Sequence, residues 1–244
     1  MKPRPPQFTT REFAEPTIEG RRTWRWVLVA AAVALVAVIA GVLIVRAVSG
    51  PDSPAATTGP AVDAADDAQR EVSFGNLRWE AVGRTEMPFS DTAGPRTLDG
   101  VAAAGFAHTE AGAILAAWQI PMRLAVLAGT DSIYRKQVLG TPGDISKLRQ
   151  SVAELQAGFD PEQTVPRVIA WRAHQPYSDQ VASYDFALPG ETATAVSLLR
   201  FSVVWMRGDW RYQPGLFGNA TTRPVDASSV HPDNGWHRFP QGAS

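Results

Sequence analysis

The chain contains no cysteine, and this absence excludes several structures at once. None of its 244 residues is a cysteine, so no disulfide can stabilise the fold and no thiol can carry a lipoprotein anchor. The folded part must therefore be held together by its own hydrophobic core.

Basic runs and catalytic motifs are missing as well. The part of the chain after residue 45 is net acidic and has no Lys/Arg run that could follow a phosphate backbone, so we expect no direct nucleic-acid binding. We find no nucleophile elbow, phosphate-binding loop or paired carboxylates at a workable spacing. The four histidines show no metal-ligand spacing. We therefore expect no enzyme, no metal site and no cofactor.

One long apolar run stands out in this sequence. Residues 26–45 contain neither a charge nor a proline, and as a helix they would extend about 30 Å, the thickness of a bilayer's hydrocarbon core. Arg21, Arg22 and Arg25 precede the run, and basic residues mark the cytoplasmic end of a membrane helix. The pattern predicts a single-pass cell-membrane protein with a cytoplasmic N-terminus and an extracytoplasmic C-terminal domain. A cleaved signal peptide is the alternative, although the run is longer than a typical signal-peptide core.

Small residues recur along one face of this predicted helix. They stand at spacings of four, three and four residues, at Ala30, Ala34, Ala37 and Gly41. Small side chains let transmembrane helices approach closely. This face is a candidate for helix–helix contact, so the predicted partners are the lipid bilayer, further copies of the chain and other envelope proteins.

Composition divides the chain into five segments. We predict a cytoplasmic arm without a fold, a transmembrane helix, a flexible linker rich in Pro, Ala, Thr and Asp, an extracytoplasmic α+β domain and a loose C-terminal tail. Their ranges are residues 1–23, 24–47, 48–70, 71–217 and 218–244.

Within the domain, helices are expected before strands. After a possible first strand in residues 71–82, residues 85–105 contain several Pro and Gly and are predicted to be an irregular loop. Thr109 is a good N-cap for a helix that is apolar on most sides, and shorter helices are expected over residues 130–139 and 142–158.

From residue 165 onward the apolar residues alternate with a period of two. This period predicts a meander of antiparallel strands. Arg207, Gly208 and Asp209 spell a cell-adhesion tripeptide, but their apolar flanks favour the tip of a β-hairpin.

This order of elements predicts an α+β domain in which the helices pack on one side of a curved antiparallel sheet, giving a cone. Such a cone can enclose a small-molecule cavity. His174, Asp185 and Arg200 lie on predicted strands that could reach its mouth, and they are the candidate pocket residues.

Residues 105–117, with the sequence GFAHTEAGAILAA, carry a resemblance to a known family. They resemble a family of uncharacterised actinobacterial membrane-anchored proteins, several of them associated with integrative and conjugative elements. The layout is also similar to the bitopic scaffold subunits of type IV secretion systems, including TcpC-like conjugation proteins. That resemblance implies an extracytoplasmic cone of the nuclear-transport-factor-like kind. It also implies a structural role in a DNA-transfer or secretion channel, with other subunits and not DNA as partners.

Two functions follow as hypotheses. The first is a membrane-tethered assembly or scaffold protein that acts through protein–protein contacts. The second is an extracytoplasmic small-molecule-binding module or orphan enzyme on the same cone. A closed cavity with converging polar groups would favour the second, whereas a cone filled by Trp118, Phe201 and Trp205 would argue against it.

Overall fold

A computed structural model describes residues 72–160, 162–190, 192–218, 220 and 224–240. The predicted arm, transmembrane helix and linker lie outside the described residues. So does the predicted contact face at Ala30, Ala34, Ala37 and Gly41.

The largest sheet is antiparallel and has the strand order β10-β5-β6-β7-β8, with β9 paired to the start of β7. Its long central strands are β6 and β7, joined by a short connection. The strands are β5 (Ala170–Ala173), β6 (Val181–Pro189), β7 (Ala195–Met206), β8 (Asp209–Tyr212), β9 (Val225–Asp226) and β10 (His237–Arg238). The alternation of apolar residues predicted the meander from β5 to β8 correctly, because one face of β6, β7 and β8 packs on α2 and Trp171 of β5 lies in the same core.

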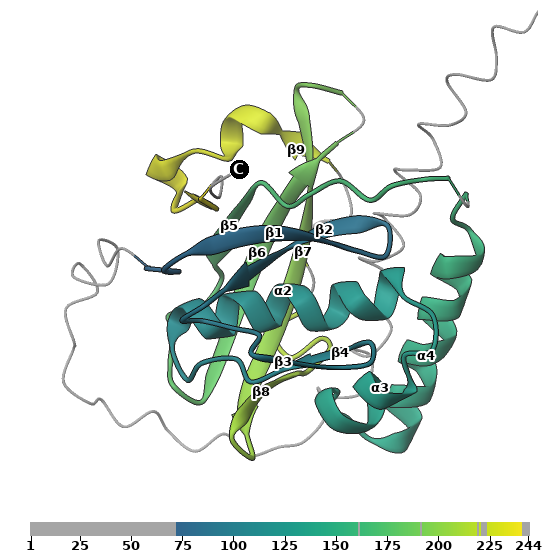
Figure 1. The fold of residues 1–244 in the computed structure, drawn as a ribbon. Helices are drawn as coiled ribbons and strands as arrows, with labels where there is room; N and C mark the ends of the chain where they lie inside the picture. Colours follow the sequence, from purple (N-terminus) through teal and green to yellow (C-terminus); the bar gives the residue numbers. More distant parts are fainter. Residues whose placement is uncertain (1–71, 161, 191, 219, 221–223, 241–244) are drawn as a thin grey trace, which may run out of the picture.

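Helix α2 (Glu110–Val126) packs across the inner face of this sheet, against β6, β7 and β8. Two small hairpins also pack against the helix: β1 (Leu77–Val82) with β2 (Thr85–Ser90), and β3 (Thr97–Asp99) with β4 (Ala102–Ala104). In Figure 1, α2 crosses in front of the large sheet, with the β1–β2 hairpin along one side of it and the β3–β4 hairpin along the other. Because it is enclosed on both sides, every residue from Ala111 to Ala125 is buried.

The start of α2 confirms the predicted N-cap. The hydroxyl of Thr109 accepts a hydrogen bond from the backbone N–H of Gly112, and Glu110 lies in the first turn, where the helix dipole favours a negative charge. The helix continues through Pro121.

Two polar side chains inside α2 tie the helix to both hairpins. The amide of Gln119 donates to the carbonyl of Pro88 in β2, and the guanidinium of Arg123 donates to Gln119 and to the carbonyl of Val101. Burial lowers the pKa of Arg123 to about 10, so the group stays charged at neutral pH. The Val101 carbonyl and the Gln119 amide oxygen thus accept from two nitrogens of the cation and offset part of the cost of burying its charge, while the other η nitrogen has no partner among the described residues.

Helices α3 (Asp131–Gln137) and α4 (Pro142–Ala157) follow α2 and lie at one end of it (Figure 1). Thr141 and Asp144 form a capping box at the start of α4. Leu148, Val152 and Leu155 are spaced four and three residues apart, so they share one face of α4, and all three are buried. The sequence therefore predicted α4 well, since both its start and its buried face depend on local signals.

Residues 85–105 do not form the irregular loop that was predicted. They contain β2, β3 and β4, because Met87, Phe89 and Ala103 are buried in the main core. The glycines fall at the turns between strands instead of interrupting them. Gly100, in the turn between β3 and β4, has a φ of +61°, a left-handed conformation that glycine adopts without strain.

The predicted loose tail is also not loose where the structure describes it. Residues 224–240 form β9, two short 3₁₀ helices and β10, and they bury Val230, Trp236 and Phe239. These apolar side chains are spaced too irregularly to show a helical or strand period. They are nevertheless buried, because the outer face of the large sheet and the β1–β2 hairpin lie beneath them.

The predicted fold class, a transmembrane helix followed by a nuclear-transport-factor-like cone, is wrong for the part of the chain that the structure describes. The described residues form an α+β structure with three α-helices and a sheet-rich C-terminal region. Hairpins enclose α2 on the side that an open cone would leave free, and the C-terminal segment covers the other face of the sheet. Within the described ranges, no helix combines the length and apolarity needed to cross a membrane.

Candidate functional site

Three charged side chains meet on the outer face of the large sheet. Arg172 in β5, Asp185 in β6 and Arg200 in β7 are direct neighbours in the strand register. Nε of Arg200 lies 2.6 Å from Oδ1 of Asp185, and an η nitrogen of Arg172 lies 2.9 Å from Oδ2. The Asp185 side chain is 1% exposed, so this charge is buried between two cations.

The two arginines determine the ionisation of this carboxyl. Burial alone would raise the pKa of Asp185, but hydrogen bonds and charges from Arg200 and Arg172 hold it below its ordinary value of 3.8. The carboxylate therefore stays ionised across the physiological range. Its two oxygens accept three hydrogen bonds from the guanidinium groups. This arrangement favours a structural role, in which Asp185 links the three strands, over a role as a general base.

His174 lies beside this cluster at the end of β5, where its backbone N–H donates to Ser183. Burial and the charge of Arg200 lower the pKa of its imidazole below 6.5, against an opposing effect of Asp185. The candidate residues His174, Asp185 and Arg200 are thus brought together. They lie on the outer face of the sheet, however, and not at the mouth of a cavity between sheet and helix.

The space between α2 and the sheet is filled by aromatic rings. The ring of Trp118 lies 5.2 Å from Phe186 and 6.3 Å from Phe201, centroid to centroid, and all three are buried. Trp205, which was expected in the same interior, is partly exposed instead. The centre of the domain is therefore a packed core, where aromatic pairs contribute directional contacts.

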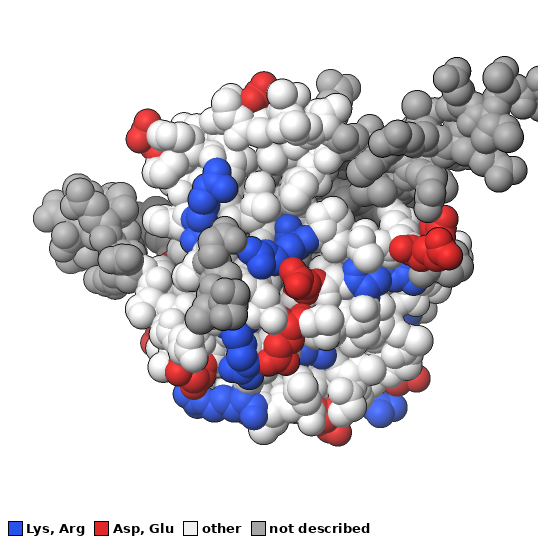
Figure 2. Space-filling view, turned by 45° about the horizontal axis from the view of Figure 1, so that its top comes forward, with Lys and Arg blue, Asp and Glu red and all other residues white. Residues whose placement is uncertain are grey.

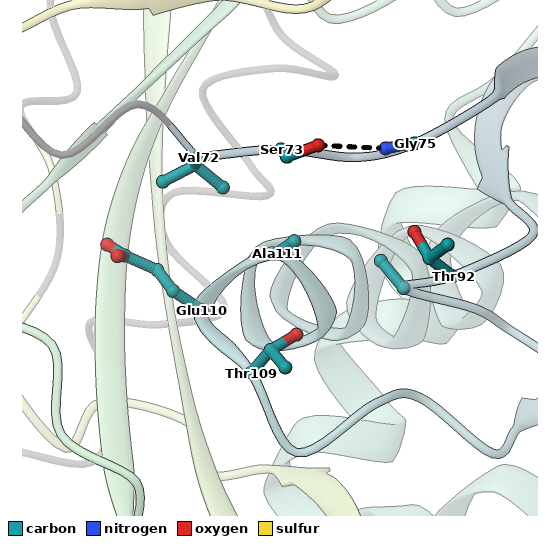
Figure 3. A pocket seen from close by; sticks show the side chains of 8 residues that line it. Val72, Ser73, Gly75, Thr92, Thr109, Glu110 and Ala111 are labelled. Atoms are coloured by element: carbon teal, nitrogen blue, oxygen red, sulfur yellow. Dashed lines mark hydrogen bonds between the residues drawn. The ribbon is translucent and has the colours of Figure 1, made fainter.

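A pocket opens at the N-terminal end of α2, with a volume of about 400 Å³. Its lining comes from the segment before β1, the turn after β2 and the first residues of α2: Val72, Ser73, Gly75, Thr92, Ala93, Thr109, Glu110 and Ala111. Figure 3 shows Val72 and Glu110 on one side of the pocket and Thr92 on the other. The hydroxyls of Ser73 and Thr109 already accept backbone hydrogen bonds, so fewer polar groups remain for a ligand.

An aromatic surface, formed by His108, Tyr177 and Trp205, lies at the same end of the domain as the tip of the β7–β8 hairpin. The imidazole of His108 stacks on Trp205 with centroids 3.9 Å apart and planes within 5°, and its Nε2 lies 2.5 Å from the carbonyl of Asp179. Tyr177 and His108 both pack against the buried Trp210. His108 is exposed, and the other two residues are partly exposed.

The sequence did not identify this surface. Trp205 was expected to help fill the core. The contact of His108 with Trp205 depends on how the β7–β8 hairpin meets the segment before α2. The alternation in β7 places Trp205 on the core-facing side, but the strand extends beyond the core at that position.

The tripeptide Arg207-Gly208-Asp209 forms the hairpin turn, with positive φ at Arg207 and Gly208. The carboxylate of Asp209 accepts hydrogen bonds from the backbone N–H groups of Gly105, Phe106 and Trp210. Burial raises the pKa of Asp209, and these backbone hydrogen bonds oppose that rise. Because its oxygens are engaged inside the domain, Asp209 cannot present the carboxylate that an adhesion motif needs.

Charges of both signs are interspersed on the face shown in Figure 2, which displays no extended area of one sign. In the described part of the chain, no group of three or more His, Cys, Asp or Glu residues is placed to hold a metal ion.

No curated protein and no solved structure matches this chain. A match to a family does exist, and it spans residues 45–236, from the end of the apolar run to Trp236 near the C-terminus. This range includes the strands and helices of the described domain as far as the second 3₁₀ helix (Pro232–Asn234). The chain belongs to the family described as Domain of unknown function (DUF8175).

Proposed function

We propose that the protein is an assembly component of the cell envelope, held at the membrane by residues 24–47, whose folded domain acts by binding other proteins. The apolar composition of residues 26–45 supports the membrane location. The packed interior supports a binding role over chemistry inside the fold, because Trp118, Phe186 and Phe201 occupy the space a central ligand would need.

The aromatic surface is the observation that carries this proposal. His108, Tyr177 and Trp205 present aromatic rings to solvent, and the neighbouring Met206 is 40% exposed. Aromatic residues and methionine are enriched at protein interfaces, where they bury much area at a low entropic cost. The buried Trp210 and the Asp209 hydrogen bonds support this surface from behind, so its rings are held in place before a partner arrives.

A finer proposal is that the assembly is a conjugation or type IV secretion channel. Its support is the resemblance of residues 105–117 to proteins associated with conjugative elements. This segment contains His108 and the start of α2, so the resemblance falls beside the aromatic surface.

Site-specific photo-crosslinking in cells tests the main proposal. A photoreactive phenylalanine analogue at Trp205 should yield discrete crosslinked products, identifiable by mass spectrometry, with envelope proteins or with a second copy. The same analogue at Lys147, an exposed position on α4, serves as the matched control and should yield few. Recovery of the protein alone, with no adduct at Trp205 and no larger species in detergent, would refute the assembly role.

Binding of a small molecule remains the second candidate function, and the pocket at the start of α2 favours it. Ala111 lines this pocket, and Ala111→Leu would fill part of it. If a compound raises the melting temperature of the wild-type protein but not of this variant, the pocket is a ligand site. A variant that responds like the wild type would place the ligand elsewhere.

A further inference from the structure

The C-terminal segment, residues 224–240, forms a strap across the outer face of the large sheet. It begins with β9, which pairs with β7, and ends with β10, which pairs with β5. The strap therefore crosses β6, which lies between those two strands. In Figure 1 it lies at the end of the sheet away from the β7–β8 hairpin. The strap therefore covers a face that would otherwise be open to solvent.

Most of the strap's apolar contacts form a cluster separate from the main core. Val230 and Trp236 in the strap pack on Ala170, Ala187 and Val196 of the sheet. The core around α2 does not include these residues. Among the described strap residues, Phe239 alone belongs to the main core, so release of the strap withdraws one ring from that core and leaves the packing around α2 in place.

Three further contacts hold the strap at its far end. The guanidinium of Arg172, already bound to Asp185, lies 4.7 Å from the ring of Trp236, a cation–π distance. Phe239 is 3% exposed between Phe74 and Trp79, and the indole N–H of Trp79 donates to the carbonyl of Pro240. The strap thus joins the β1–β2 hairpin to the sheet.

The backbone pairing of the strap is short. Each of β9 and β10 is two residues long, and β10 pairs His237 with Trp171 and Arg238 with Ala170. When the strap leaves, β5 becomes an edge strand with unpaired backbone groups beside an apolar patch. Such an edge accepts an added strand readily.

We propose that this strap exchanges between copies of the protein, so that the strap of one copy occupies the outer sheet face of another. A second copy's strap fits this face because it is the same segment. It reproduces the β10 pairing, the Trp236 cluster and the Phe239 contact without any new complementary surface. This inference rests on the assembly function proposed above and names one mode of it, self-association.

The connection to the strap is compatible with such exchange. Between the end of β8 at Tyr212 and the start of β9 at Val225, the described residues form neither helix nor strand. Gly215 and Gly218 in this stretch have φ of +68° and +73°. Glycine reaches both signs of φ at little cost, so these positions can redirect the chain without disturbing the sheet.

Engineered cysteines test the exchange cleanly, because the natural chain has none. Two full-length chains with different tags are co-expressed, one with Ala170→Cys in the sheet and one with Arg238→Cys in the strap. Directly opposed residues in an antiparallel pair have Cα atoms about 4.5–5.5 Å apart, within the range for a disulfide. The expected result is a disulfide between the two tagged chains, seen at the mass of a dimer and lost on reduction.

Ala170 is fully buried, so random collision does not reach a cysteine there. Pairing Ala170→Cys with Lys147→Cys on α4 is the matched control and should give no such dimer. A second control is a single chain that carries both Ala170→Cys and Arg238→Cys, which tests whether these two cysteines can form a disulfide at all. If that chain closes internally while the mixed pair gives no dimer, the exchange is refuted. If that chain forms no internal disulfide, the pair Val196→Cys and Val225→Cys replaces the first pair, because these residues are opposed in β7 and β9. The dimer and the internal disulfide are then measured in the same way.

The outcome separates this inference from the assembly function. Photo-crosslinks at Trp205 without a strap disulfide between copies would leave the assembly function standing and refute the exchange. A strap disulfide without photo-crosslinks would support self-association through the strap and refute the role given to the aromatic surface.

Discussion

Arg200 binds Asp185 through two nitrogen atoms, with Nε 2.6 Å from Oδ1 and an η nitrogen 3.2 Å from Oδ2. Such two-point pairing matches the planar guanidinium to the carboxylate and is stronger than a single contact. The Arg200 side chain is 16% exposed and the Asp185 side chain 1%, so the pair is screened little by water. Its remaining η nitrogen donates to the carbonyl of Phe217, which ties the segment after β8 to the sheet.

Removal of the shared carboxylate should destabilise the domain strongly. Asp185→Ala leaves two guanidinium groups facing each other in a mostly buried position, and breaking a buried pair in this way costs about 3–5 kcal/mol. The free energy of unfolding, measured with urea, should fall accordingly. The matched control is Glu80→Ala, which breaks the exposed Arg78–Glu80 pair and should cost less than about 1 kcal/mol. If both variants lost the same free energy of unfolding, the Asp185 ion pairs would contribute no more to stability than an exposed pair.

The pKa of His174 should respond to the same cluster. Burial and the charge of Arg200 lower this pKa below 6.5, so the folded state binds the proton less well than the unfolded state. The stability from this group is complete above pH 6.5 and is lost as pH falls toward the lowered pKa. Arg200→Met removes the repulsion, and an NMR titration should show the His174 pKa move upward. An unchanged pKa in that variant would assign the lowering to burial and to the charge of Arg172 instead.

Phe239 should behave as a core residue although it stands five residues from the end of the chain. Truncation of a buried phenylalanine typically costs about 3–5 kcal/mol, and Phe239→Ala removes the ring that Phe74 and Trp79 contact. The neighbouring Arg238→Ala is a control, because that side chain is exposed and its loss should change stability by less than about 0.5 kcal/mol. The free energy of unfolding in urea distinguishes a packed strap from the loose tail that composition suggested. In a loose tail, both substitutions would change this free energy equally little.

The sequence predicted what depends on neighbours along the chain. Thr109 and Thr141 carry cap signals within one helical turn, so the starts of α2 and α4 were located correctly. The strands β6 and β7 show a clear alternation over many residues. The two-residue strands β9 and β10 are too short to show any period, and their residues are ordered by contacts with distant parts of the chain.

The candidate site was predicted in part for the same reason. Alternation places Asp185 and Arg200 on the face opposite the apolar residues of their strands. That they are direct partners depends on the register between β6 and β7, which the loop between them sets and which sequence pattern alone does not give. The contact of Arg172 with Trp236 also depends on residues distant in the sequence, because the strap must fold back over the sheet to form it.

Asp209 should hold the β7–β8 hairpin against the segment before α2. Asp209→Ala removes the acceptor for the N–H groups of Gly105 and Phe106, and hydrogen bonds to charged groups contribute about 1.5–3 kcal/mol. Hydrogen exchange at those two amides should accelerate in the variant. Asp99→Ala, which breaks only an exposed contact with Lys136, is the control and should leave both amides protected as in the wild type. Equal protection in the Asp209 variant would contradict this role.

Gly112 in α2 should not tolerate the smallest side chain. Glycine-to-alanine substitution inside a helix normally stabilises by about 1 kcal/mol, but a Cβ at Gly112 would lie 2.1 Å from the carbonyl oxygen of Ala107. That oxygen belongs to the backbone and also accepts from the indole N–H of Trp210, so it cannot shift without disturbing the support of the aromatic surface. Gly143→Ala in α4 is the matched substitution, because its nearest neighbour would be 3.8 Å away. Thermal unfolding should show a clear loss for Gly112→Ala and no loss for Gly143→Ala. Equal melting temperatures of the two variants would contradict the prediction, because they would show that the short distance between Gly112 and the Ala107 carbonyl does not limit stability.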